Sequence, residues 1–188
     1  MKKSGKSTAK ILESKIAFEG PLFSVVTERV REPGGYTVRR DVIRHPGSVV
    51  VLAVRDGARG AEVLLERQYR HAARGYLWEL PAGKVDQGES DLAAAKRELL
   101  EETGYAAKQW KPILTFFVSP GFLDEQMRVF LARGLKAGKA QPEEDELIEC
   151  RFVSLRAALG MIEKKQIRDA KTIAPLYWLA LRQCALSA

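Results

Sequence analysis

The segment "DLAAAKRELLEETG" at positions 91–104 decides the fold, because it predicts a long helix in the middle of a chain that is otherwise rich in strands. Its residues have high helix propensity throughout. Ser90, directly before the segment, is a typical N-cap, and Gly104 is the residue type expected just past the last helical turn. We therefore predict a helix over residues 91–103.

Three glutamates, Glu98, Glu101 and Glu102, gather near the end of this helix. At 100° per residue they lie within an arc of about 100°, and we expect this arc on the face away from the leucines. An ordinary solvated helix face explains such a cluster, and Arg97 with Glu101 would form a common i,i+4 ion pair. On spacing alone, the solvated face is the simpler interpretation.

Two features of the same segment favour a metal site instead. Like charges at i,i+4 destabilise a helix slightly, and carboxylates near its C-terminal end oppose the helix dipole. A glycine-rich loop that carries Glu89 also precedes the helix. Clustered carboxylates beside an open loop suit Mg²⁺, which takes a few carboxylate oxygens and leaves positions for water and phosphate.

Strands are predicted on both sides of the central helix, and helices at the end of the chain. This order predicts an α+β fold, in which a mixed β-sheet is sandwiched between α-helices, rather than a regular βαβ winding. The sequence contains neither GxGxxG nor GxxxxGK[ST], so it indicates no Rossmann nucleotide site and no P-loop. We expect β-structure over 15–44, 48–54, 62–70, 112–119, 127–135 and 150–154, and helices over 155–165 and 172–184.

Length and composition indicate one soluble globular domain. The chain has 188 residues, of which 46% are hydrophobic and 29% are charged. No apolar run reaches the roughly 18 residues of a membrane span, and no hydrophobic signal region follows the basic start. Cys150 and Cys184 belong to no CxxC pair, so we expect free thiols and a cytoplasmic location.

The net charge of +7 is spread along the whole chain rather than gathered in one basic block. A nucleic-acid partner is therefore unlikely on charge alone, although binding with a steep salt dependence would support one. A basic surface and the steering of an anionic small substrate are the other interpretations.

The spacing around the helix carries a specific resemblance. Gly83 is followed after five residues by Glu89, and after seven more by the run from Arg97 to Gly104. This pattern resembles the Nudix box, G-x5-E-x7-R-E-U-x-E-E-x-G-U, where U is a bulky aliphatic residue. Each fixed polar and glycine position matches. The last U position holds Tyr105, a departure at a packing position that leaves the chemistry untouched.

The resemblance extends over roughly residues 15–182 and is to the ADP-ribose pyrophosphatase branch of the Nudix family. The segments that carry this resemblance are "RQYRHA" (67–72), "LWELPAG" (77–83) and "SPGFLDE" (119–125), with Pro120 fifteen residues after the box. The resemblance implies a Nudix fold and hydrolysis of the pyrophosphate bond of ADP-ribose to AMP and ribose 5-phosphate. It also implies Mg²⁺, with Mn²⁺ as a substitute.

The resemblance also implies roles for individual residues. The metal ligands would be the carboxylates of Glu98, Glu101, Glu102 and Glu146 and the carbonyl of Ala82. Arg97 would orient the glutamates. The general base would come from the late acidic loop "PEEDELIE" (142–149), where we expect Glu144; an exposed acidic loop is the alternative. Gly83, Glu89 and Gly104 complete the motif.

Substrate contacts are expected from the flanking segments: Arg67, Arg70, Glu79, Pro120 and Glu125. Because side chains alternate along a strand, only one of the two arginines can point into the site. We expect Arg67 to be that residue, with Glu79 bonding to substrate or fixing Arg67.

The expected organisation is a flexible tail over 1–14, N-terminal strands over 15–45 and a Nudix hydrolase domain over 46–188. The branch is often homodimeric, with the N-terminal strands shared across the sites, so we expect a homodimer. Two alternatives stay open. One is a pyrophosphatase for other nucleotide sugars, such as ADP-glucose or GDP-mannose, and the other is a binding or sensor module without catalysis.

Overall fold

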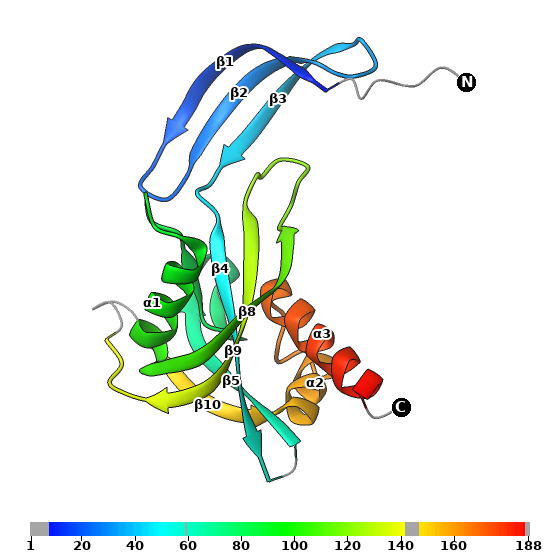
Figure 1. Cartoon of the computed structure of the whole chain (residues 1–188). Coiled ribbons are helices and arrows are strands. Elements are labelled where there is room, and N and C mark those ends of the chain that lie inside the picture. Colours follow the sequence, from blue (N-terminus) through cyan, green and yellow to red (C-terminus); the bar gives the residue numbers. More distant parts are fainter. Residues whose placement is uncertain (1–7, 59, 142–146, 187–188) are drawn as a thin grey trace. The chain divides into compact units, whose positions relative to one another are not determined.

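The computed structural model describes residues 8–58, 60–141 and 147–186, with side chains to residue 183. The chain divides into two compact units. One comprises Met1–Gly47 with Phe117–Gln126, and the other comprises Ser48–Phe116 with Met127–Ala188. Figure 1 shows their elements in chain order.

The first unit is a three-stranded antiparallel sheet in the order β1-β2-β3, coloured blue to cyan in Figure 1. Its strands are β1 (Lys10–Glu19), β2 (Ser24–Arg31) and β3 (Thr37–Arg44). They confirm the strands predicted over 15–44. β1 begins inside the stretch expected to be a tail, because Lys10 already pairs with Arg31 across the sheet.

The second unit is built on a mixed sheet with the strand order β10-β5-β4-β9-β8. β4 runs antiparallel to β5 and parallel to β9, so the sheet is mixed as predicted. Two short strands extend it, since β6 pairs with β5 and β7 pairs with β4. The bounds are β4 (Ser48–Gly57), β5 (Gly60–Arg70), β6 (Gly75–Glu79), β7 (Ala82–Lys84), β8 (Tyr105–Phe117), β9 (Gln126–Ala137) and β10 (Glu149–Ser154).

Helices cover both faces of this sheet, which confirms the predicted sandwich. Val50, Leu52 and Val54 of β4 belong to a core with α2 (Leu155–Glu163) and α3 (Ala170–Leu186). The alternate residues Val49, Val51 and Ala53 belong to a second core with α1 (Asp91–Thr103). β4 is therefore buried on both faces, as its unbroken apolar run requires.

Three strands of the second unit differ from the prediction. β6 and β7 lie where no strand was expected, and β8 begins at Tyr105 instead of near residue 112. Pairing with β5, β4 and β9 holds these residues extended although their sequences lack a strong strand pattern. In the described part of the chain, no helix is both long and apolar enough to cross a membrane.

Candidate active site

α1 begins and ends where the sequence predicts. The Ser90 hydroxyl accepts a hydrogen bond from the Ala93 amide at 3.2 Å, which caps the first turn. Gly104 adopts a left-handed conformation with φ of 72°, and its amide bonds to the Leu100 carbonyl at 2.9 Å. These caps define the ends of the helix, and the packing of Ala95 and Leu99 against the sheet sets the direction of its carboxylates.

Two of the three glutamates face inward, which corrects the prediction that they lie away from the apolar face. Glu98 and Glu102 are only 8% and 5% exposed, whereas Leu100 is 43% exposed. Ala95 and Leu99 pack against the sheet, and the glutamates lie beside them. The buried face of α1 is therefore part apolar and part acidic, which a solvated-face interpretation does not explain.

Gly83 makes room for one of these carboxylates. A Cβ placed on Gly83 would coincide with the carboxylate of Glu98, so no other residue type fits here without moving that group. One residue earlier, the Ala82 amide donates a hydrogen bond to Glu102 Oε2 at 3.0 Å. The Ala82–Gly83 backbone and the two buried carboxylates thus lie against one another.

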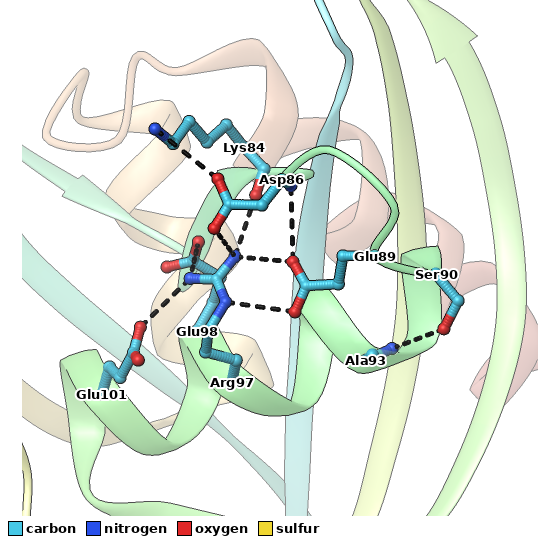
Figure 2. Close-up of polar contacts among 8 residues, drawn as sticks. All are labelled: Lys84, Asp86, Glu89, Ser90, Ala93, Arg97, Glu98 and Glu101. Atoms are coloured by element: carbon cyan, nitrogen blue, oxygen red, sulfur yellow. Dashed lines mark hydrogen bonds and ion pairs between the residues drawn. The ribbon is translucent and has the colours of Figure 1, made fainter.

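Arg97 ties the box glutamates together, as Figure 2 shows. Its Nη1 bonds to Glu98 Oε1 at 2.7 Å and to Glu101 Oε2 at 3.1 Å. Its Nε and Nη2 bond to the two carboxylate oxygens of Glu89 at 3.2 and 3.0 Å, and Nη2 also reaches the Lys84 carbonyl at 3.1 Å. The predicted ion pair between Arg97 and Glu101 is present, and it is one contact in a larger hydrogen-bond network.

The charges of this network shift the pKa values of its members. Hydrogen bonds from Arg97 lower the pKa of Glu89 below its ordinary value. In return, hydrogen bonds to Glu89, followed by those to Glu98 and Glu101, raise the pKa of Arg97 despite its partial burial. The arginine therefore stays charged, and Glu89 stays ionised at neutral pH.

The two arginines of the "RQYR" segment lie on opposite faces of the sheet. Arg70 shares the face of Leu64, which packs in the α1 core, whereas Arg67 shares the face of Leu65, which packs in the α2–α3 core. Arg67 stacks over the Tyr76 ring, 4.5 Å from its centroid. The arrangement therefore favours Arg70 over Arg67, against the sequence-based expectation.

Glu79 binds Arg70. Among the contacts of the described residues, none joins Glu79 to Arg67. Both Nε and Nη2 of Arg70 bond to Glu79 Oε2, at 2.9 and 2.7 Å. Burial alone would lower the pKa of Arg70, but the bonds to Glu79, with the charges of Glu79, Glu66 and Glu102, raise it. The charge of Glu102 acts on Arg70 because Arg70 lies near the acidic side of α1.

Glu66 is a buried carboxylate that the sequence reasoning missed. It lies on the same face of β5 as Arg70 and is 0% exposed. Burial, followed by the charges of Glu66, Glu102 and Glu149, raises the pKa of the nearby Cys150 thiol to about 12. The signal in the sequence is an acidic residue that directly follows the apolar run "VLL" (63–65) within a predicted strand.

Four predicted residues lie outside the described residues or in the first unit. Glu144 and Glu146, the expected base and additional ligand, lie outside the described residues. Pro120 and Glu125 belong to the first unit, where Glu125 Oε1 lies 3.7 Å from His45 Nδ1. The site described above is therefore built within the second unit alone.

The donor set of the second unit fits a divalent cation. Within the described residues no three His, Cys, Asp or Glu side chains already converge as a metal site, because Arg97 binds Glu98 and Glu101 while the Ala82 amide binds Glu102. However, two buried carboxylates lie beside the Ala82–Gly83 backbone, and the missing Cβ of Gly83 leaves room for that of Glu98. Hard oxygen donors of this kind are what Mg²⁺ and Mn²⁺ bind.

Known proteins resemble this chain in sequence and in fold. The NUDIX domain family matches residues 44–176. The ADP-ribose pyrophosphatase of Bacillus subtilis (strain 168) is 39% identical over 88% of this chain and 89% of its own, and the methanol dehydrogenase activator of Bacillus methanolicus is 35% identical over 93% and 94%. A crystal structure of ADP compounds hydrolase matches with a TM-score of 0.79 at 22% identity, over 95% of this chain and 96% of its own. The chain therefore belongs to the Nudix family and is a Nudix hydrolase of the pyrophosphatase kind.

Proposed function

We propose that this protein hydrolyses the pyrophosphate bond of ADP-ribose to AMP and ribose 5-phosphate, in a reaction that depends on Mg²⁺, with Mn²⁺ as a substitute. The observation that carries the proposal is the pair of buried carboxylates, Glu98 and Glu102, set against the Ala82–Gly83 backbone. Relatives named ADP-ribose pyrophosphatase, 30–39% identical to this chain, support the choice of substrate.

Glu98, Glu102 and the Ala82 carbonyl are the groups that would hold the ion, with Glu101 beside them. When bound, a divalent ion supplies positive charge that offsets the charge of the pyrophosphate and makes water easier to deprotonate. Arg97 keeps the carboxylates in place through the hydrogen bonds described above. Glu101, whose side chain is 44% exposed, is the outermost of the three.

Arg70 is the residue that we propose to bind the phosphates, since it lies on the α1 face of β5. A guanidinium held by one carboxylate oxygen keeps other N–H groups for a second acceptor, and its planar fork suits phosphate. Arg67, Pro120 and Glu125 remain candidates for contacts to the rest of the substrate. A comparison of Arg70→Lys with Arg67→Lys tests the assignment, because the larger rise in KM should follow from Arg70→Lys.

We propose Glu144 as the general base that takes the proton from the attacking water, and Glu146 as a further ligand. A base must lie within hydrogen-bond reach of that water, and the box carboxylates are already committed to Arg97 and the metal. The test compares kcat for Gln or Asn substitutions at each position from 143 to 146. Nearly full activity of Glu144→Gln would rule out this assignment.

The substrate is tested by product analysis. The protein is incubated with ADP-ribose, ADP-glucose and GDP-mannose, with and without Mg²⁺, and the products are identified by chromatography. We expect AMP and ribose 5-phosphate from ADP-ribose, and no turnover after chelation. Faster hydrolysis of another nucleotide sugar would move the assignment to that substrate, and failure to hydrolyse any of them would support the non-catalytic alternative.

We also propose a homodimer in which β1 to β3 take part. Apolar side chains that a monomer leaves exposed lie on this sheet: Ile11 is 53%, Ile16 57% and Phe18 52% exposed. Exposed apolar residues in a group indicate an interaction surface. Sedimentation equilibrium tests this, because Ile16→Lys with Phe18→Lys should shift the mass from dimer to monomer. A wild-type monomer would contradict it.

A further inference from the structure

The start of α3 is connected to the site loop through a buried hydroxyl. The Leu80 amide donates a hydrogen bond to Thr172 Oγ1 at 2.8 Å, across 92 residues of sequence. Both residues are 0% exposed. Thr172 Oγ1 in turn donates to Asp169 Oδ2 at 2.7 Å, so the hydroxyl is fixed from both sides.

Leu80 lies two residues before Ala82, and the backbone between them is held at four points. The Leu80 amide is held by Thr172, the Pro81 carbonyl accepts from the Val51 amide at 2.8 Å, Ala82 pairs with Val50 in the sheet, and the Ala82 amide donates to Glu102. Of these four contacts, two come from β4, one from α1 and one from the start of α3. Thr172 is therefore the contact that connects this backbone to α3.

A second connection runs from α3 to Glu79. Lys171 Nζ lies 2.9 Å from Glu79 Oε2 and 3.0 Å from Asp169 Oδ2. Glu79 Oε2 is the same oxygen that accepts both hydrogen bonds from Arg70. The Glu79 side chain is 3% exposed, and one of its carboxylate oxygens is thus shared by two cations.

This sharing has an electrostatic consequence. Burial alone would raise the pKa of Glu79, but the charge of Lys171 and then the contacts with Arg70 hold it below its ordinary value. Without Lys171, Arg70 would be the only cation bonded to a buried carboxylate. Little water screens charges at a buried site, so Arg70 would then bind Glu79 strongly and without competition from Lys171.

We propose that Asp169, Lys171 and Thr172 form a positioning element that orients Arg70 through Glu79 and fixes the backbone leading to Ala82. None of the three contacts substrate in this proposal. It rests on the proposed function, because Arg70 and Ala82 are there the phosphate-binding and metal-binding groups. Outer partners of this kind are typically worth tenfold to a hundredfold in metal affinity or activity.

The role of the Thr172 hydroxyl is tested with Thr172→Val, which keeps the shape of the side chain and removes the acceptor of the Leu80 hydrogen bond. We expect kcat/KM to fall about tenfold, Mn²⁺ affinity measured without substrate to fall about tenfold, and the Leu80 amide to exchange hydrogen faster. Thr172→Ser should restore all three, and Thr115→Val on the exposed part of β8 should leave them unchanged. Unchanged Mn²⁺ affinity and unchanged kcat/KM in Thr172→Val would overturn the proposal. If Thr172→Val does not fold, Asp169→Asn takes its place with the same criteria.

The lysine is tested with Lys171→Met, with Lys171→Arg as the conservative variant and Lys136→Met as the exposed control. We expect KM to rise about tenfold with a smaller change in kcat, since Glu79 then holds Arg70 away from the phosphates. Mn²⁺ affinity should change less than in Thr172→Val. Equal KM values for Lys171→Met and wild type would overturn the proposal.

The failure of this inference is distinguishable from failure of the proposed function. If the wild-type protein does not hydrolyse ADP-ribose, the substrate assignment fails. Mn²⁺ affinity and Leu80 amide exchange in Thr172→Val still decide the inference. If the wild type is active and the variants match it in every readout, the function stands and the inference fails.

Discussion

Two clusters of charged side chains lie in the second unit, and they differ in origin and in charge. The Arg97 cluster gathers Arg97 and Lys84 with four carboxylates from a single stretch, those of Asp86, Glu89, Glu98 and Glu101, so the net charge is −2. The Glu79 cluster combines Arg70, Glu79, Lys171 and Asp169 from distant segments, and two cations meet two carboxylates.

This difference in charge suits the two clusters to different roles, the Arg97 cluster to binding a cation and the Glu79 cluster to positioning other groups. An excess of negative charge that is partly exposed invites a divalent cation, because the carboxylates repel one another and a cation relieves that repulsion. A buried cluster with balanced charge has little affinity for further ions, and instead fixes the geometry of the groups that form it. Substitutions in the first cluster should therefore damage chemistry, and those in the second should alter binding and stability.

The largest expected effect is the loss of activity in Glu98→Gln or Glu102→Gln. Each change removes a charged oxygen of a proposed metal ligand, and a bound metal ion typically contributes several kcal/mol to such a reaction, so kcat/KM should fall about a thousandfold. The measurement is steady-state hydrolysis of ADP-ribose. Glu163→Gln in α2, a change of the same kind at an exposed position, should retain wild-type activity. A loss of less than tenfold in both site variants would place the metal elsewhere.

Gly83→Ala is expected to have the next largest effect. Its Cβ would coincide with the Glu98 carboxylate and displace it, and a displacement of about 1 Å costs about a hundredfold in rate. Gly160→Ala is the matched control, because a Cβ there meets no atom within 4 Å. That control should keep its activity and gain about 0.5–1 kcal/mol of stability in α2. Wild-type kcat in Gly83→Ala would show that Glu98 need not occupy this space.

Arg97→Lys should cost about tenfold in kcat/KM, because an ammonium group cannot bond to Glu89, Glu98 and Glu101 together. The loss should be smaller at saturating Mg²⁺ if Arg97 only orients the carboxylates. A loss that is independent of Mg²⁺ concentration would assign Arg97 a direct role with the substrate.

The smallest effect concerns stability at acid pH. The pKa of Glu79 is lowered in the folded protein, so its ionised form stabilises the fold above the ordinary value of 4.5, and this contribution is lost as pH falls through the folded pKa. Urea unfolding between pH 6 and 3 should show a shallower decline for Glu79→Gln than for wild type. Identical slopes would mean that Arg70 and Lys171 do not hold this carboxylate in solution.

The sequence allowed the Arg97 cluster to be predicted, because all of its members lie within a single stretch of the chain. Fixed spacing from Gly83 to Gly104 identified the motif, and the caps at Ser90 and Gly104 predicted the helix bounds. The glutamates were still placed wrongly, on the face away from the leucines. At 100° per residue Glu102 lies only about 60° from Leu99, so Glu98 and Glu102 are buried beside that leucine, whereas Leu92 and Leu100 are 37% and 43% exposed.

The Glu79 cluster could not be predicted in the same way. Its members are brought together by sheet pairing and by the packing of α3, which local patterns do not encode. Strand alternation correctly required that only one of Arg67 and Arg70 face the site. It did not say which, because that depends on which core each face of β5 meets.

Direct metal binding tests the central claim, that Glu98 and Glu102 beside Gly83 hold the catalytic cation. The measurement is a titration of Mn²⁺ followed by electron paramagnetic resonance, for the wild type, for Glu163→Gln and for the double variant Glu98→Gln with Glu102→Gln. We predict saturable binding to the first two proteins and its loss in the double variant, with all three folded. Mn²⁺ binding by the double variant equal to that of the wild type would contradict the account.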